Sequence, residues 1–132
     1  MASARDAASD GASGTVSLQK AGSEAVNFSP ATCRSGEHRL FLGADFLDTA
    51  GQTARVVIDP LGGSTLRFFS EDRPQIEGTI FRKSDCTTFN MVLDRTGWWI
   101  DDIYDLKVQL DFTCRLNSGE AASGTLSAAH CH

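Results

Sequence analysis

The sequence predicts an all-β domain, an antiparallel β-sandwich of about eight to ten short strands, with a small β-barrel as the alternative. Three observations predict this fold class. Apolar residues alternate with a period of two, turn-forming residues separate the apolar runs, and no stretch follows the period of about 3.6 residues typical of an amphipathic helix. With 132 residues, of which 41% are hydrophobic, the chain is long enough to bury one core of its own.

The clearest strand covers residues 104–114, where apolar and polar side chains alternate without a break. Successive side chains of a strand point to opposite faces, so this pattern predicts one core-facing side and one solvent-facing side. The core-facing side would carry Tyr104, Leu106, Val108, Leu110, Phe112 and Cys114, and the solvent-facing side Asp105, Lys107, Gln109, Asp111 and Thr113.

The other strands are predicted where short apolar runs lie between Gly, Pro, Asp, Asn or Ser residues. Residues 94–97 and 117–120 can supply the positive φ that a hairpin turn needs, and residues 59–63 contain a proline and two glycines that would end a strand. Consecutive strands are therefore expected to be antiparallel neighbours. The predicted strands are 15–20, 38–46, 53–58, 65–69, 76–82, 87–93, 98–103 and 121–130.

Residues 1–14 differ from the rest of the chain, because Ala, Ser and Gly dominate them and they show neither apolar periodicity nor the apolar region of a signal peptide. We expect a flexible leader that follows a removed signal peptide or tethers the domain. Residues 15–132 would then form a single β domain. A lipid-bearing cysteine would lie outside this sequence, so lipid anchoring stays open.

The four cysteines, Cys33, Cys86, Cys114 and Cys131, are the most informative single count. They are even in number, and none belongs to the closely spaced Cys-x-x-Cys pair that zinc sites commonly use, so two disulfides are predicted. Disulfides persist in oxidising compartments. We therefore expect an extracytoplasmic protein that is periplasmic, tethered to the outer membrane or secreted.

Three pairings of the four cysteines are possible, and we favour Cys33–Cys86 with Cys114–Cys131. A tight turn at residues 118–119 would leave the sulfurs of the second pair too far apart, so that bridge requires a wider loop or a bulge. The strand parity of residues 126 and 131 differs, which favours a bulge between them.

The end of the chain combines a strand that reaches Cys114, a polar hairpin, the segment Gly124-Thr-Leu126 and a final Cys131. This arrangement resembles the ends of small bacterial exported proteins and lipoproteins. Those proteins share no single activity. The resemblance therefore supports an exported, bacterial protein and implies no function.

The formal net charge of −5 bears on the class of partner. A nucleic-acid interface needs clustered Lys and Arg residues, whereas the 12 basic residues of this chain are scattered. No run of about 18 apolar residues occurs, so no transmembrane segment is predicted. We expect no cofactor and a protein or glycan partner at the cell envelope, and the oligomeric state stays open.

Trp98, Trp99 and Tyr104 lie close in sequence to Asp101 and Asp102. Aromatic rings combined with carboxylates suit sugar stacking, Ca²⁺ ligation or contact with a protein. Adjacent side chains of a strand face opposite sides, so one of the two indoles must point outward. These five residues form the predicted contact surface. The alternative is that one indole fills the core, the other covers a hairpin, and the aspartates only solvate an edge strand.

His130 and His132 would lie on one face of a strand, about 6–7 Å apart. With His38 as a third ligand they could form an open Zn or Cu site. The alternative is that a frayed terminus carries two solvated histidines.

The sequence holds no catalytic motif that we can identify. Asp101 and Asp102 cannot share a strand face, so glycosidase-type catalysis would need Asp105, Glu77 or another acid, and no Gly-x-Ser-x-Gly elbow occurs. The sequence therefore favours an extracytoplasmic binding or accessory domain without catalysis. A metal-binding exported protein, a small secreted hydrolase and a purely structural envelope component are the alternatives.

Overall fold

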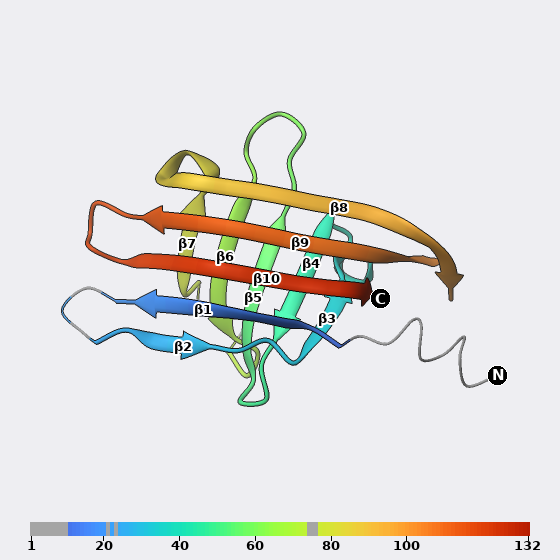
Figure 1. The fold of residues 1–132 in the computed structure, drawn as a ribbon, viewed down its shortest axis with the longest axis horizontal. Helices are drawn as coiled ribbons and strands as arrows, with labels where there is room; N and C mark the ends of the chain where they lie inside the picture. Colours follow the sequence, from blue (N-terminus) through green and yellow to red (C-terminus); the bar gives the residue numbers. More distant parts are fainter. Residues whose placement is uncertain (1–10, 21, 23, 74–76) are drawn as a thin grey trace.

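The computed structural model describes residues 11–132 except residues 21, 23 and 74–76. Within this part of the chain, ten strands form two five-stranded antiparallel sheets (Figure 1), which confirms the predicted β-sandwich. The first sheet has the order β2-β1-β10-β9-β8, and the second has the order β3-β4-β5-β6-β7.

The first sheet contains β1 (Ser13–Gln19), β2 (Val26–Phe28), β8 (Cys86–Ile100), β9 (Ile103–Arg115) and β10 (Ala121–Cys131). The second sheet contains β3 (Thr32–Ser35), β4 (Gly43–Leu47), β5 (Gln52–Val57), β6 (Thr65–Ser70) and β7 (Thr79–Arg82). Two short 3-10 helices, η1 (Gly36–Arg39) and η2 (Lys83–Asp85), connect strands. None of the helices in the described ranges is long and apolar enough to cross a membrane.

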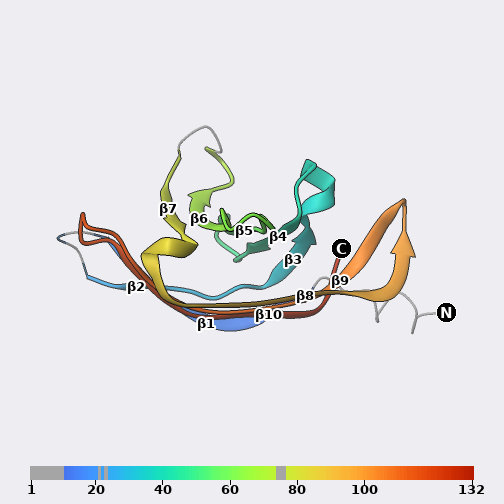
Figure 2. The same ribbon diagram turned by 90° about the horizontal axis from the view of Figure 1, so that it is seen from above.

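The core lies between the two sheets, whose strands cross steeply (Figure 1). Figure 2 shows the second sheet curved over the inner face of the first. The predicted alternation of residues 104–114 is confirmed for the core side, because every second residue from Leu106 to Cys114 is buried and Tyr104 is half-buried. The largest fully buried side chains come from both sheets and include Phe46, Leu66, Phe81, Leu110, Phe112 and Leu126.

Two disulfides join Cys33 to Cys131 and Cys86 to Cys114. The first links β3 to β10 and thereby connects the two sheets through the core, where both cysteines are fully buried. The second links β8 to β9 within the first sheet. The prediction of two disulfides is confirmed, but the favoured pairing of Cys33 with Cys86 and of Cys114 with Cys131 is wrong.

The wrong pairing follows from a misplaced hairpin turn. Residues 94–97 form no turn but lie inside β8, which runs for 15 residues. The turn between β8 and β9 lies at Asp101 and Asp102 instead, and this shift places Cys86 directly opposite Cys114. Gly97, with φ of 98°, lies where the register between β8 and β9 shifts, between Arg95 and Trp99. The sequence that was predicted to form a turn therefore forms a β-bulge.

The predicted bulge in the last strand is confirmed. Ala128 pairs with Val108 and Cys131 pairs with Leu106, so two residues, Ala129 and His130, stand opposite one residue of β9. The bulge restores Cys131 to the core face. It does not bring Cys131 to Cys114, which pairs with Ala122 near the other end of β10.

The region between residues 26 and 43 departs most from the prediction. β2 and β3 were not predicted, and the first part of the predicted strand 38–46 is the helix η1, which ends at Leu40 with φ of 64°. β4 begins only at Gly43. This glycine has φ of 144°, and a Cβ atom there would lie 1.9 Å from the carbonyl oxygen of Val56, so only glycine fits.

The first strand begins earlier than predicted. β1 starts at Ser13 rather than at residue 15, and Gly11 forms an isolated bridge with Thr32. The predicted flexible leader over residues 1–14 is therefore wrong for residues 11–14. Its other residues, 1–10, lie outside the described part of the chain.

Candidate functional site

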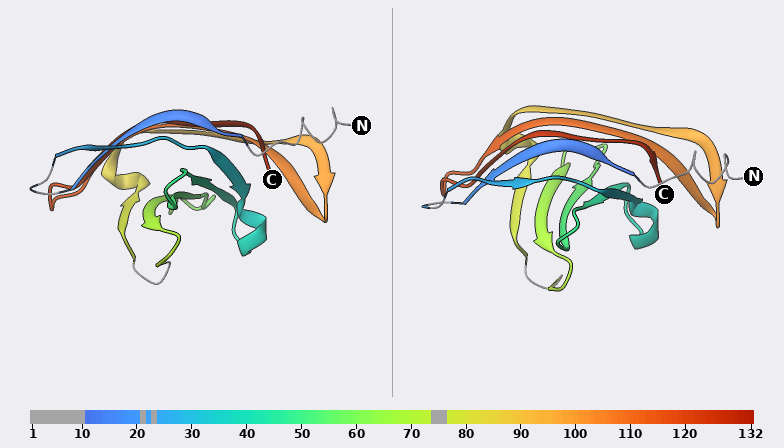
Figure 3. Two further views of the ribbon diagram at one scale, coloured as in Figure 1. Left: turned by 90° about the horizontal axis from the view of Figure 1, so that it is seen from below. Right: turned by 60° about the horizontal axis from the view of Figure 1, so that its bottom comes forward.

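The end of the sandwich at which β8 turns into β9 projects beyond the second sheet. β8 has 15 residues and β9 has 13, whereas the strands of the second sheet have four to six. Because the sheets cross, this extra length extends past β3 and η1 (Figure 2). Figure 3 shows the hairpin tip bending toward the side on which η1 lies. The face that elsewhere packs on the core is therefore partly uncovered here.

Trp99 lies on this uncovered face. It pairs directly with Tyr104, which has the same strand parity as the buried Leu106, and 61% of its surface is exposed. The ring centroids of Trp99 and Tyr104 are 6.4 Å apart and their planes are tilted by 33°. The guanidinium carbon of Arg95 lies 3.7 Å from the centroid of the Tyr104 ring, a cation–π contact. We call Arg95, Trp99 and Tyr104 the aromatic shelf.

Asp101 and Asp102 form the two-residue turn beside the shelf, between the paired residues Ile100 and Ile103. Their φ angles of 53° and 64° are of the kind that a type I′ turn requires. Both residues are exposed. The prediction that residues 98–103 form a strand is therefore wrong at these two positions, and the two carboxylates lie at the tip that also carries Trp99.

Trp98 has the opposite strand parity to Trp99 and is half-buried. Its backbone N–H donates a hydrogen bond to Oγ1 of Thr96 at 3.4 Å. The strongly exposed indole is therefore Trp99 on the core-facing side, and strand alternation alone does not explain its exposure. Of the five predicted contact residues, the structure brings Trp99, Tyr104 and the two aspartates to one hairpin end and places Trp98 on the other face of β8.

Asp105 was assigned to the solvent-facing side of its strand, and this prediction is wrong because its side chain is fully buried. Bulges in both neighbouring strands cover it: Thr96 comes from β8 and His130 from β10. Oδ2 of Asp105 accepts hydrogen bonds from Oγ1 of Thr96 and from Nδ1 of His130, each at 2.6 Å. Oδ1 has no hydrogen-bond partner among the described residues. Sequence periodicity cannot predict this cluster, because each bulge changes which face of the sheet the residues after it point to.

The three histidines of the predicted metal site lie at the same end of the sandwich. Nδ1 of His130 is engaged by Asp105, and Nε2 of His132 lies 3.1 Å from the carbonyl oxygen of Ile103. The His38 and His132 rings meet edge to face, with centroids 5.5 Å apart. In the part of the chain that the structure describes, no three His, Cys, Asp or Glu residues are grouped so as to hold a metal ion. The metal hypothesis therefore gains no support from this geometry.

The helix η1 connects this end to the second sheet. Oγ of Ser35 caps the helix by accepting a hydrogen bond from the backbone N–H of Glu37 at 3.2 Å. Oε2 of Glu37 in turn accepts a hydrogen bond from the backbone N–H of Tyr104 at 3.1 Å. Glu37 thus fixes the start of β9, and with it the Tyr104 ring of the aromatic shelf.

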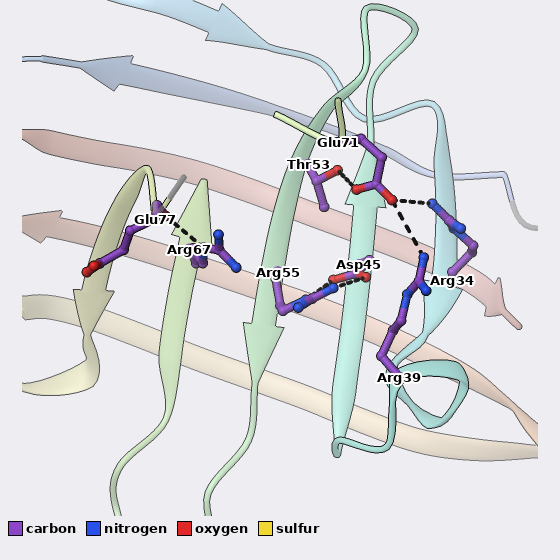
Figure 4. A network of polar contacts seen from close by, with 8 residues as sticks. All are labelled: Arg34, Arg39, Asp45, Thr53, Arg55, Arg67, Glu71 and Glu77. Atoms are coloured by element: carbon purple, nitrogen blue, oxygen red, sulfur yellow. Dashed lines mark hydrogen bonds and ion pairs between the residues drawn. The ribbon is translucent and has the colours of Figure 1, made fainter. Parts of the chain in front are cut away.

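A second group of polar residues, which the sequence did not predict, lies on the outer face of the second sheet (Figure 4). Arg34, Asp45, Arg55 and Arg67 are direct cross-strand neighbours on β3, β4, β5 and β6. Arg55 donates two hydrogen bonds to Asp45, at 2.8 and 3.0 Å. These bonds raise the pKa of Arg55 above its ordinary value, against the effect of burial. Asp45, Arg55 and Arg67 each lie between apolar residues within a predicted strand, and this was the available signal for three members of the row; Arg34 lies in β3, which was not predicted.

Comparison of the chain with protein-family models, curated proteins and solved structures finds no match.

Proposed function

We propose that this protein is a glycan-binding domain without catalytic activity, and that the aromatic shelf and the Asp101–Asp102 turn form its binding surface. The observation that carries the proposal is the exposure of Trp99, 61% of whose surface is open to solvent although the residue lies on the core-facing side of its sheet. Its partner Tyr104 is held by Arg95 and by the bond of its N–H to Glu37. An exposed indole beside this held tyrosine ring offers a flat apolar surface on which a ligand can stack.

The chemistry of the hairpin tip favours a glycan over a protein partner. The C–H face of a sugar ring can stack on an indole, and carboxylates such as those of Asp101 and Asp102 accept hydrogen bonds from sugar hydroxyls. Aspartate, by contrast, is depleted at the centres of protein–protein interfaces. The combination of one open indole with two exposed carboxylates therefore fits a saccharide better.

We also propose an extracytoplasmic location, at the bacterial cell envelope or in the secreted fraction. Two disulfides support this proposal, because intracellular reductants keep most cytosolic thiols reduced. A glycan ligand agrees with it, since cell-envelope and extracellular polysaccharides are found in the same compartments.

The test is a screen of immobilised oligosaccharides, followed by calorimetric titration of the best ligand with wild type and with Trp99→Ala. Loss of a central aromatic anchor should weaken binding by about tenfold or more. The matched control is Leu61→Ala, which removes a 94% exposed apolar side chain from the connection between β5 and β6 and should leave the affinity unchanged. Circular dichroism and the melting temperature establish that both variants are folded.

The proposal is overturned if no oligosaccharide binds, or if a bound oligosaccharide keeps its affinity in folded Trp99→Ala. A purified protein partner that loses affinity in Trp99→Ala, with no saccharide bound, would replace the glycan by a protein at the same surface.

A further inference from the structure

The outer face of the second sheet concentrates positive charge in a chain that is acidic overall, with a net charge of −5. The cross-strand row Arg34, Asp45, Arg55 and Arg67 runs over four strands, and Arg39 reaches the same face from η1 (Figure 4). Cationic groups gathered on one face create a local positive potential even when the whole protein is negative.

Arg55 and Asp45 form the fixed centre of this face. Asp45 is buried, and its two carboxylate oxygens take both hydrogen bonds from Arg55. The guanidinium of Arg55 also lies 4.9 Å from the ring centroid of Phe41 and 5.1 Å from that of Phe69. The charges of Arg55 and Asp45 cancel each other, and two aromatic rings hold the Arg55 guanidinium in place. The pair is therefore a rigid, neutral part of the surface between the more exposed arginines.

Arg34 and Arg39 share a single carboxylate. Their Nη2 atoms lie 3.3 and 3.8 Å from the same oxygen, Oε1 of Glu71, whose Oε2 accepts a hydrogen bond from Oγ1 of Thr53 at 2.9 Å. The two arginine side chains are 39% and 55% exposed. One carboxylate cannot neutralise two guanidiniums, and long, exposed ion pairs are readily exchanged for another anion.

A hollow of about 410 Å³ opens beside these arginines, lined by Arg34, Ser35, His38, Arg39 and Asp45. Its lining carries the hydrogen-bond donors of two guanidiniums, and Asp45 is already neutralised by Arg55. The hollow lies next to η1, whose Glu37 contacts the backbone of Tyr104 in the aromatic shelf. The helix η1, which contributes His38 and Arg39 to the hollow, therefore connects the hollow to the shelf.

We propose that the hollow binds an anionic group, a sulfate, phosphate or carboxylate, carried by the glycan that the shelf recognises, and that Arg34 and Arg39 hold this group. That the anionic group belongs to a glycan rests on the proposed function, whereas the anion site itself is inferred from the arginines alone. Glu71 occupies the arginines in the free protein and is displaced from them, in whole or in part, when the ligand's anionic group binds. Guanidinium groups suit this role because their planar donor fork matches oxyanions.

The first experiment titrates the protein with sodium sulfate at constant ionic strength and follows backbone amide chemical shifts by NMR. Saturable shifts are expected at residues 34–39, in and around η1. Arg39→Gln should lower the sulfate affinity by about tenfold, the loss of one charge-assisted contact. Glu71→Gln should raise it by at least about threefold, since the internal competitor loses its charge while its amide oxygen can still accept the bond from Thr53.

Arg115→Gln is the matched control, because it removes the same charge from an exposed position at the end of β9. It should change the sulfate affinity less than about twofold, the effect of net charge alone. Absence of saturable shifts, equal losses in Arg39→Gln and Arg115→Gln, or weaker binding in Glu71→Gln would each overturn the anion site.

The second experiment compares the oligosaccharide found in the screen with its sulfated derivative. The sulfated form should bind about tenfold more tightly to wild type, and this preference should disappear in Arg39→Gln. Equal affinity for the two forms overturns the inference while the glycan-binding function stands. Absence of binding by either form overturns the proposed function, and the sulfate titration then decides on the anion site by itself.

Discussion

Nδ1 of His130 donates a hydrogen bond of 2.6 Å to Oδ2 of Asp105, a carboxylate that is fully buried between two bulged strands. The same oxygen accepts the hydroxyl of Thr96. This contact ties the last strand, β10, to the point at which β8 and β9 leave the sandwich. It therefore supports the base of the hairpin that carries the aromatic shelf.

His130→Ala should lower the free energy of unfolding by about 2 kcal/mol, because it leaves a buried carboxylate with one hydrogen bond fewer. Chemical denaturation measures this change. Gln109→Ala, at an exposed position of the neighbouring β9, is the control and should stay within about 0.5 kcal/mol of wild type. Equal stabilities of the two variants would show that the Asp105 contact contributes nothing to the fold.

The two disulfides should differ in their contribution to stability. Cys33–Cys131 spans 98 residues and Cys86–Cys114 spans 28. In the chain-entropy model the longer loop stabilises by about 4.7 kcal/mol and the shorter by about 3.6 kcal/mol. Replacing Cys33 and Cys131 by Ser should therefore cost about 1 kcal/mol more than replacing Cys86 and Cys114, as measured by denaturation of the two double variants. The reverse order would contradict the entropic account.

Asp102→Gly should stabilise the protein and weaken glycan binding. Glycine adopts the φ of 64° at this turn position without the steric cost that a side chain carries, so the unfolding free energy should rise by about 0.5–1 kcal/mol. The lost carboxylate should lower the affinity for the glycan. Thermal melting and calorimetric titration measure the two effects. A variant that gains stability and keeps its affinity would remove Asp102 from the binding surface.

The Asp45–Arg55 pair should behave as a coupled unit. Asp45→Ala leaves Arg55, whose side chain is only 23% exposed, without its carboxylate partner, at a cost of about 2 kcal/mol. Arg55→Met should also destabilise the protein, because it leaves the buried Asp45 carboxylate without its ion-pair partner. In the double variant the losses should not add, with a coupling energy of about 1–3 kcal/mol in a double-mutant cycle. Additive losses would mean that the pair contributes no interaction energy.

The hairpin tip shows how much of the candidate site the sequence could predict. The composition of residues 98–104 indicated an aromatic and acidic surface, and strand alternation required one indole to face away from the core. That indole is Trp98, which is half-buried, whereas the strongly exposed indole is Trp99 on the core-facing side. Trp99 is exposed because of the length by which β8 and β9 extend beyond the second sheet. That length depends on how the two sheets cross, and it cannot be predicted from a local sequence pattern.

The row of charged residues on the second sheet could not be assembled from the sequence for a related reason. Asp45 and Arg55 are ten residues apart, and they meet only because the register of β4 with β5 places them opposite each other. Arg34 belongs to a four-residue strand that local propensity did not indicate. A charged residue inside a strand pattern normally points to solvent, and only the register shows that it is paired.

Local sequence patterns were enough to predict the fold class, the core side of the strand at residues 104–114, the presence of two disulfides and the bulge before Cys131. These features depend on periodicity, composition and parity, which are local. The disulfide pairing, the burial of Asp105, the exposure of Trp99 and the row of arginines became apparent only in the folded structure. Each of these depends on which strands become neighbours and in what register, and those contacts join residues far apart in the chain.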